Sequence, residues 1–347
     1  MKLLVVIANY RVTDLTIDCL RSIAGEIETV PDTHVAVCEN GTGDDAAERI
    51  LKAITNNGWS SWCSVTAVRP NLGFTGGNNV ILSPALQSED PPQYVLLLNA
   101  DTIVRQGALK QLVDFMDQRP RVGIAGSRLE NLDGTPQRSA FRFPSPLSEF
   151  EAGLKLGFVT KLLERWVVAP PVSDEACETD WLAGASMIIR REVFRDIGLL
   201  DEGYYTFFED VDFCFNARKA GWPIWYVPAS RIVHLVGRST GITISKPRRQ
   251  PSYSFEARRR YFLKNYGPFR AILVDTGQIV GLSLWRLRVL LGKPDSTAPH
   301  FLGDSIRHSV FVTGFRLKNV QNPAIASRGS AIKNLRGTPR ESLGPGN

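Results

Sequence analysis

The feature that most constrains this chain is the alternation, over its first 127 residues, of short apolar runs with segments of helical length. The segments between the runs predict helices over about 14–24, 44–56, 77–87 and 106–119. Continuous apolar strands alternating with helices predict an α/β fold, with a mostly parallel central sheet flanked by helices. The five apolar runs predicted to be strands are Leu3–Ala8, His34–Cys38, Val65–Arg69, Tyr94–Asn99 and Val122–Ser127.

Polar residues directly after these strands are the first candidates for a binding site, because ligands of open parallel sheets bind beyond the carboxyl ends of the strands. Tyr10, Glu39 and Asn71 follow three of the runs, and Asp101 follows a fourth. A strand-end carboxylate can hold Mg²⁺ or Mn²⁺ together with the oxygens of a diphosphate. Asp101 can equally be the N-cap of the following helix.

The segment Asn71–Asn79 (NLGFTGGNN) has three glycines within five residues, beginning at Gly73. Glycine lets backbone approach a ligand closely, and backbone N–H groups at the start of a helix attract anions. The pattern is neither a Walker loop nor the glycine fingerprint of dinucleotide-binding folds. A tight turn is the alternative interpretation.

An acidic cluster follows the aromatic run 204–208, and contains Glu209, Asp210 and Asp212. Neighbouring carboxylates beside apolar bulk have raised pKa values, which suits a general base. The alternative is an acidic helix N-terminus stabilised by the helix dipole. Strands are predicted over 224–227 and 231–234. The second ends at His234, whose neutral imidazole is a good ligand for a divalent ion, although most such histidines are structural.

Charge is distributed unevenly along the chain. Residues 1–242 hold 23 Lys and Arg against 30 Asp and Glu, a net of −7, whereas residues 243–347 hold 18 against 5, a net of +13. The basic part predicts a helical region over 243–320 that faces an anionic partner, either a membrane surface or a nucleic acid, although it contains no recognisable nucleic-acid-binding module. A basic tail that is merely soluble is the alternative interpretation. The composition from residue 321 onward predicts disorder.

Within this basic region one helical face is apolar, but the segment that carries it is too charged to span a bilayer. Such a face is suited to lie in the membrane interface. Packing on the rest of the chain, or a contact in a homo-oligomer, is the alternative. The residues of this face, called the apolar stripe below, are Leu273, Val280, Leu284, Leu287 and Leu291.

The expected compartment is the cytoplasm. The apolar run at 3–8 is too short for the core of a signal peptide, and no stretch of about 20 apolar residues occurs. The five cysteines have no paired spacing, which indicates buried thiols in a reducing compartment.

Six motifs in order resemble those of the inverting family-2 glycosyltransferases with the GT-A fold, in particular the bacterial rhamnosyltransferase-like branch. The resemblance covers about residues 1–240 and implies a GT-A domain over 1–242, with a donor-binding half over about 1–127 and an acceptor and catalytic half over about 128–242. The motifs are VIANYR at 6–11, ENG at 39–41, NLGFTGGNN at 71–79, LNADT at 98–102, WLAGASMIIR at 181–190 and GLLDEGYYTFFEDVDFCFNARKAG at 198–221, with His234 after them.

The resemblance also implies roles for single residues. Asp210 corresponds to the catalytic base, and Asp101 with His234 to the ligands of Mg²⁺ or Mn²⁺. Two positions depart from the family pattern: the metal motif begins with Asn99 instead of Asp, and position 39 is Glu where Asp is more usual. The implied donor-binding residues are Tyr10, Glu39, Asn71, Gly73 and Asp101, and those on the acceptor side are Trp181, Gly184, Ala185 and Glu209.

The implied reaction is an in-line displacement at the anomeric carbon with inversion. The favoured donor is dTDP-L-rhamnose, with a UDP-sugar such as UDP-galactofuranose as the alternative. The acceptor would be a lipid-linked or polysaccharide hydroxyl in cell-surface glycan synthesis, which allows a peripheral position on the inner face of the cell membrane. A non-catalytic binding protein on the same fold is a distant alternative.

Overall fold

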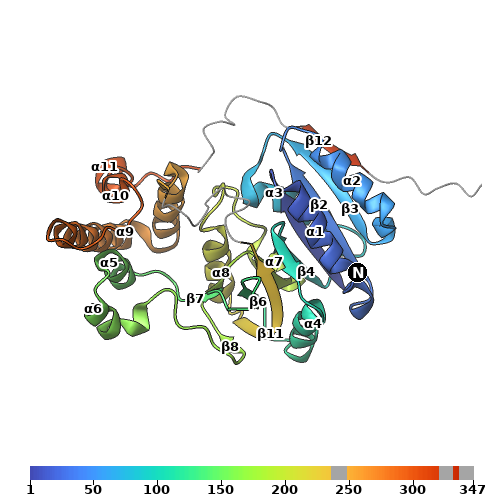
Figure 1. Cartoon of the computed structure of the whole chain (residues 1–347), viewed down its shortest axis with the longest axis horizontal. Helices are drawn as coiled ribbons and strands as arrows, with labels where there is room; N and C mark the ends of the chain where they lie inside the picture. The colour runs from blue at the N-terminus through green and yellow to red at the C-terminus, as the bar shows by residue number, and fades with distance from the viewer. Residues whose placement is uncertain (236–247, 320–330, 336–347) are drawn as a thin grey trace, which may run out of the picture.

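A computed structural model describes residues 1–235, 248–319 and 331–335 of the chain (Figure 1). A central sheet has helices on both faces, and a group of further helices lies at one end, on the left of Figure 1. The strands of the sheet are β1 (Leu3–Asn9), β2 (Thr33–Asn40), β3 (Cys63–Arg69), β4 (Tyr94–Asn99), β5 (Thr102–Val104), β6 (Ile124–Glu130), β8 (Cys177–Glu178), β10 (Ser186–Arg190), β11 (Ile224–His234) and β12 (Ala331–Leu335).

The N-terminal half of the sheet is parallel, in the order β3-β2-β1-β4, as the alternation predicts. Successive side chains of a strand point to opposite faces, so β1 divides its apolar residues between two cores. Val5 packs with α1 (Thr13–Ala24), α2 (Ala46–Asn56) and α4 (Ala108–Gln118). Val6 packs with α3 (Gly73–Leu86), α7 (Arg191–Ile197) and α8 (Glu209–Lys219) on the other face.

The helix predicted over 77–87 begins four residues earlier, at Gly73. The φ angle of Gly73 is +73°, and a Cβ at this position would overlap the carbonyl oxygen of Tyr205. Asn40 holds the turn from the other side, since its Oδ1 accepts from Leu72 N at 2.9 Å and its Nδ2 donates to Gly73 O at 2.8 Å. The glycines therefore lie in the first turns of α3, where tertiary contacts override their low helix propensity.

The other half of the sheet is mixed. Strand β10 runs antiparallel between β4 and β6, and β11 runs parallel to β6 and antiparallel to the short β5. The two strands predicted over 224–227 and 231–234 form the single strand β11, with a register shift between Val227 and Arg231. Pro228 lies in the shift and lacks the N–H that a regular ladder needs, which explains the bulge.

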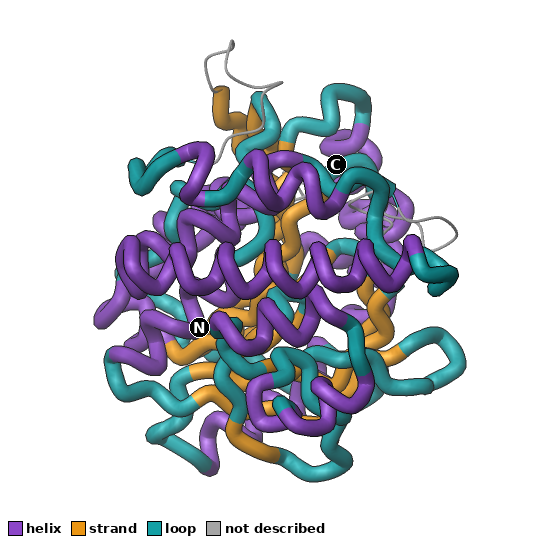
Figure 2. The backbone as a smooth tube through the Cα atoms, turned by 90° about the vertical axis from the view of Figure 1, so that its left-hand side faces the viewer, coloured by secondary structure: helices purple, strands orange, loops and turns teal. Residues whose placement is uncertain are grey.

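A group of five helices, called the helical layer below, lies at the left end of Figure 1 and faces the viewer in Figure 2. The long α9 bends at Gly267, whose φ of 80° and ψ of 179° interrupt the helix just before Pro268. Gly281 packs so closely on α5 that a Cβ there would overlap the carbonyl oxygen of Phe150. The layer consists of α5 (Pro146–Leu154), α6 (Gly157–Leu162), α9 (Ser252–Leu290), α10 (Phe301–Arg307) and α11 (Val310–Thr313).

The apolar stripe lies on α9 and at its C-cap, and it faces solvent, because its five residues are 39% to 79% exposed. The opposite face of α9, with Val274 and Leu282, is the buried one. None of the helices in the described ranges is long and apolar enough to cross a bilayer.

Part of the tail differs from the prediction of disorder. Residues 331–335 form β12, which pairs antiparallel with the edge strand β3. The rest of 321–347, like the start of the basic region at 243–247, lies outside the described residues. A tail that is rich in Gly and Ser can still add a strand, because an unpaired sheet edge supplies the backbone partners.

Candidate active site

The ends of β4 and β11 bring together residues that are far apart in the sequence. Asn99 ends β4, His234 ends β11, and Asp101 lies in the turn after β4. The His234 Nε2 atom lies 3.5 Å from Asp101 Oδ1 and 3.3 Å from Asn99 Nδ2. The N-cap interpretation of Asp101 is wrong, since α4 begins only at Ala108 and its N-cap is Gly107.

This pair fits half of a divalent-metal site. A carboxylate oxygen and a neutral imidazole nitrogen are both common metal ligands. Across the described ranges, no group of three or more His, Cys, Asp and Glu residues could hold a metal ion by itself. The Asp101–His234 pair would therefore need further ligands from a bound substrate, such as the oxygens of a diphosphate.

The acidic cluster begins α8 after a strained turn. Phe207 and Phe208 both have left-handed backbone, with φ angles of 70° and 64°. Each residue with such a backbone raises the free energy of the folded state by about 1–3 kcal/mol, and it persists where surrounding contacts hold it. Those contacts come from α9: the Phe207 ring stacks on Tyr253 with centroids 5.9 Å apart, and Phe208 packs on Tyr261 at 5.5 Å. The helical layer thus holds the turn that positions the start of α8.

Asp210 is held by two backbone N–H groups. Gly184 N donates to its Oδ2 at 3.2 Å, and Val211 N donates to its Oδ1 at 2.8 Å. Burial raises the pKa of Asp210 above that of an ordinary aspartate, although these hydrogen bonds oppose the shift. A carboxyl group with a raised pKa, fixed in orientation at the start of a helix, has the properties of a general base.

Glu209 lies beside Asp210 and is 8% exposed. Its Oε2 atom is buried and has no hydrogen-bond partner among the described residues. Burial, and then the negative charge of Asp210, raise the pKa of Glu209 well above its ordinary value. The helix dipole of α8 favours both carboxylates, but burial outweighs it in setting their pKa values.

The segment Trp181–Ala185 links the base to the other strand ends. A Cβ on Gly184 would lie 3.4 Å from the Phe74 ring and 3.7 Å from the Asp210 Cβ, so Gly184 lies between the glycine segment and the base. The Ala185 carbonyl accepts from Asn99 N at 3.0 Å. Trp181, which begins β9 (Trp181–Leu182), donates its indole N–H to the Arg142 carbonyl at 2.9 Å. That indole N–H is therefore engaged within the protein.

The remaining predicted residues lie at the ends of β1, β2 and β3. Glu39 is buried, and its Oε1 accepts from Thr42 N at 2.8 Å. Tyr10 is half-buried, with the Arg11 guanidinium 5.0 Å from its ring centroid. Asn71 uses its Oδ1 to accept from Gly73 N at 2.7 Å. An open pocket of about 600 Å³ adjoins these loops and is lined by residues that include Arg11, Thr13, Thr42, Asp44 and Arg49.

Residues 2–252 match the family model described as "Glycosyltransferase like family 2". The chain belongs to this family. It is a nucleotide-sugar-dependent glycosyltransferase with the GT-A fold.

Two curated relatives and one solved structure resemble this glycosyltransferase. The N-acetylglucosaminyl-diphospho-decaprenol L-rhamnosyltransferase of Mycobacterium tuberculosis is 26% identical over 224 residues, which is 62% of this chain and 70% of the relative. Rhamnosyltransferase WbbL of Escherichia coli is 26% identical over 196 residues, 54% of this chain and 71% of the relative. The crystal structure of GalNAc-T7 with UDP, GalNAc and Mn²⁺ has a TM-score of 0.56 at 14% identity, over 91% of this chain and 58% of that one.

Asp212 of the glycosyltransferase has a contact role that the sequence pattern does not reveal. It is buried and accepts from Tyr204 Oη at 3.0 Å, Lys264 Nζ at 2.7 Å and Asn265 Nδ2 at 2.7 Å. The acidic cluster therefore divides into two parts, with Glu209 and Asp210 at the site and Asp212 anchoring α8 to α9. The only sequence signal for the contact between α8 and α9 is the opposite net charge of residues 1–242 and 243–347, and this signal does not indicate which residues pair.

Asn40 is a second position that the sequence analysis does not single out, although it directly follows Glu39 in the same motif. Its two hydrogen bonds fix the turn that opens the glycine segment of this glycosyltransferase. A polar residue that is buried at a strand end is the signal that could have indicated this role.

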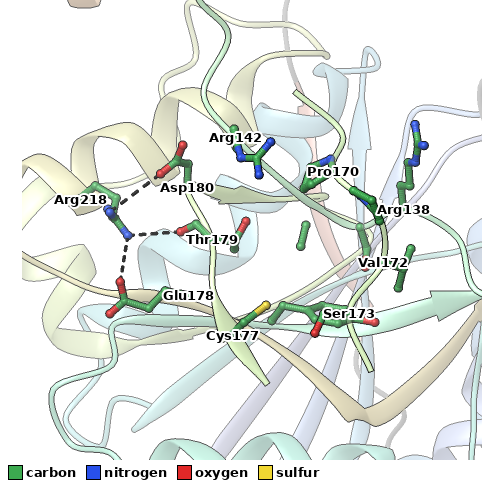
Figure 3. Close-up of a pocket in the computed structure, with 14 residues that line it drawn as sticks. Arg138, Arg142, Pro170, Val172, Ser173, Cys177, Glu178, Thr179, Asp180 and Arg218 are labelled. Atoms are coloured by element: carbon green, nitrogen blue, oxygen red, sulfur yellow. Dashed lines mark hydrogen bonds and ion pairs between the residues drawn. The ribbon is translucent and has the colours of Figure 1, made fainter. Parts of the chain in front are cut away.

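A second cavity of about 460 Å³ borders the Trp181 segment, since its lining includes Asp180 and also Arg142, whose carbonyl accepts from the Trp181 indole (Figure 3). It contains none of the predicted site residues. The Arg218 guanidinium on its wall contacts the Thr179 carbonyl at 3.3 Å, Glu178 at 3.6 Å and Asp180 at 3.9 Å. Arg218 lies near the C-terminal end of α8, about 12 Å along the helix from Asp210, so this wall of the cavity is remote from the base.

Proposed function

We propose that this glycosyltransferase moves L-rhamnose from dTDP-L-rhamnose onto a hydroxyl of a lipid-linked or polysaccharide acceptor in cell-surface glycan synthesis. The two rhamnosyltransferase relatives and the order of the six motifs support the sugar. The observation that carries the reaction type is the half-buried Asp210 carboxyl, whose pKa is raised and whose orientation is fixed by Gly184 and Val211. One well-placed base suits a single displacement with inversion.

In the proposed reaction Asp210 accepts the proton of the acceptor hydroxyl. The hydroxyl oxygen forms a bond to the anomeric carbon from the face opposite the nucleoside diphosphate, and the bond from that carbon to the diphosphate oxygen breaks. Burial keeps the basicity of Asp210 high, because removal of water disfavours the carboxylate form. Tyr10 and Glu39 would bind the nucleotide base, and Asn71 with the glycine segment after it would line the donor pocket.

We also propose a divalent ion, Mg²⁺ or Mn²⁺, held by Asp101, His234 and the oxygens of the donor diphosphate. When bound, such an ion stabilises the negative charge that develops on the leaving diphosphate. The GalNAc-T7 structure, which has a similar fold, contains Mn²⁺. This likeness in fold supports the proposal of a divalent ion.

Removal of the metal should abolish transfer. We expect excess EDTA to stop nucleoside diphosphate release, and Asp101→Asn and His234→Ala each to weaken Mn²⁺-dependent binding of the donor at least about tenfold, because each removes one of two protein ligands. Titration calorimetry with and without Mn²⁺ measures this. Asp114→Asn, on the exposed side of α4, is the matched control. Full activity in excess EDTA would contradict the metal assignment.

A donor screen tests the proposed sugar. Release of nucleoside diphosphate is measured with dTDP-L-rhamnose, UDP-galactofuranose and GDP-sugars in parallel. We expect turnover with dTDP-L-rhamnose and little with the others. Tight UDP binding without dTDP binding would replace the rhamnose proposal with the UDP-sugar alternative.

The proposed acceptor also bears on location. If the acceptor is lipid-linked, the enzyme works as a peripheral protein on the inner face of the cell membrane, where that lipid is presented.

A further inference from the structure

The helical layer presents large apolar side chains to solvent from three of its helices. The apolar stripe is exposed along the second half of α9. On α6, Phe158 is 76% exposed, and on α11, Phe311 is 57% exposed. In Figure 1, α6 and α11 lie on either side of α9, and the same end of the molecule faces the viewer in Figure 2. An apolar surface of this extent marks an interaction site, since isolated surface helices expose mainly polar residues.

The apolar stripe is a different face of α9 from the one that packs on α5. The face of α9 that packs on α5 uses small and polar residues for close contact, including Gly277, Gly281 and Gln278. The large aliphatic residues point the other way, at intervals of three, four or seven residues from Leu273 to Leu291. The stripe therefore extends about 27 Å along one side of a helix. It is long enough to lie along a surface, whereas no described helix can span a bilayer.

The charge of the same region indicates which partner covers the stripe. Residues 248–319 hold 13 Lys and Arg against 4 Asp and Glu, a net of +9. A second copy of this chain would bring the same basic patch against itself, because a two-fold contact is self-complementary. An anionic bilayer offers both an apolar interior and negative headgroups. Exposed basic residues of the layer lie on the helix that carries the stripe, at Arg270 and at Arg286, which also pairs with Asp295. Others lie on α6 at Lys161, after α9 at Lys293 and on α10 at Arg307.

We propose that the helical layer docks on an anionic lipid bilayer, with the apolar stripe inserted among the headgroups and the basic side chains on the phosphates. The first half of α9 holds the turn before Asp210 through Tyr253 and Tyr261. Docking would therefore fix the base relative to the lipid surface, where the hydroxyl of a lipid-linked acceptor is presented. The role of this surface in bringing a lipid-linked acceptor to Asp210 rests on the proposed function, but lipid binding itself does not.

The test is sedimentation of the full-length protein with vesicles of phosphatidylcholine, alone or mixed with phosphatidylglycerol. We expect binding only to the mixed vesicles, and we expect it to fall as salt rises. The triple variant Leu273→Gln, Leu284→Gln, Leu287→Gln should bind at least about tenfold more weakly, since three aliphatic side chains no longer leave water. Glutamine keeps helix propensity, and all three positions are exposed, so the melting temperature should not fall.

The matched control is Leu132→Gln, an exposed leucine away from the layer, which should bind vesicles like the natural chain. Three results would overturn the proposal: no binding to mixed vesicles at low salt, equal binding by the triple variant, or a dimer that the triple variant dissociates while lipid binding persists. The last would assign the stripe to a contact between copies. Because the assay contains no sugar donor, its failure is distinguishable from failure of the proposed reaction, which dTDP binding in solution reports separately.

Discussion

Asp210→Asn should lower kcat by about 10²–10⁴-fold or more while the affinity for the donor nucleotide stays nearly unchanged. The asparagine keeps the shape of the side chain and can still accept from Gly184 N, but it cannot take a proton. Product formation and dTDP binding are measured on the same preparation. Asp114→Asn, which removes an exposed carboxylate, is the matched control and should retain full turnover. Near-normal turnover in a folded Asp210→Asn protein would contradict the assignment of Asp210 as the base.

Stability measurements separate loss of the base from loss of the fold. Asp210 and Glu209 both have raised pKa values in the folded protein. Their contribution to stability is therefore present below the pKa of the unfolded chain and is lost as pH rises through the folded pKa. At neutral pH both carboxylates disfavour folding, so Asp210→Asn should melt at the same temperature or higher. For the same reason, turnover of the natural enzyme should fall with acidification at a higher pH than an ordinary aspartate would give.

Arg258→Met should destabilise the protein by about 3–5 kcal/mol, because it leaves two buried carboxylates without their shared cation. Arg258 donates to Glu149 Oε2 of α5 at 2.9 Å and to Asp275 Oδ1 at 2.7 Å, so it joins α5 to both halves of the bent α9. Urea denaturation followed by tryptophan fluorescence measures the change. Arg121→Met, at an exposed position outside the layer, is the matched control.

A compensated variant tests whether the charge imbalance is the cause. Arg258→Met combined with Glu149→Gln and Asp275→Asn removes all three charges. Val310 N donates to Asp275 Oδ2 at 2.7 Å in the natural chain, and the amide oxygen introduced by Asp275→Asn can still accept this hydrogen bond. We expect the triple variant to recover more than half of the stability that the single variant loses. If Arg258→Met alone were as stable as Arg121→Met, the ion cluster would contribute little to the free energy of unfolding.

Local patterns predicted the parallel half of the sheet because each of its strands is a continuous apolar run. β1 to β4 lie within two residues of their predicted positions. The predicted start of α3 is too late, since the contact between Gly73 and Tyr205 joins segments over a hundred residues apart and leaves no local signal. The predicted division of β11 has the same origin: Pro228 indicates a break locally, but pairing with β6 on both sides makes one strand.

The sequence by itself determined the family, the strand-end positions of Tyr10, Glu39 and Asp101, and the presence of an acidic cluster, because these depend on residue type and spacing along the chain. Only the tertiary structure decided which carboxylate has which environment. Asp210 faces Gly184, whereas Asp212 is bound by Lys264, and the difference depends on which side of α8 meets α9. It also decided that the apolar stripe faces outward, since a helical apolar face has the same periodicity whether it meets protein, lipid or water.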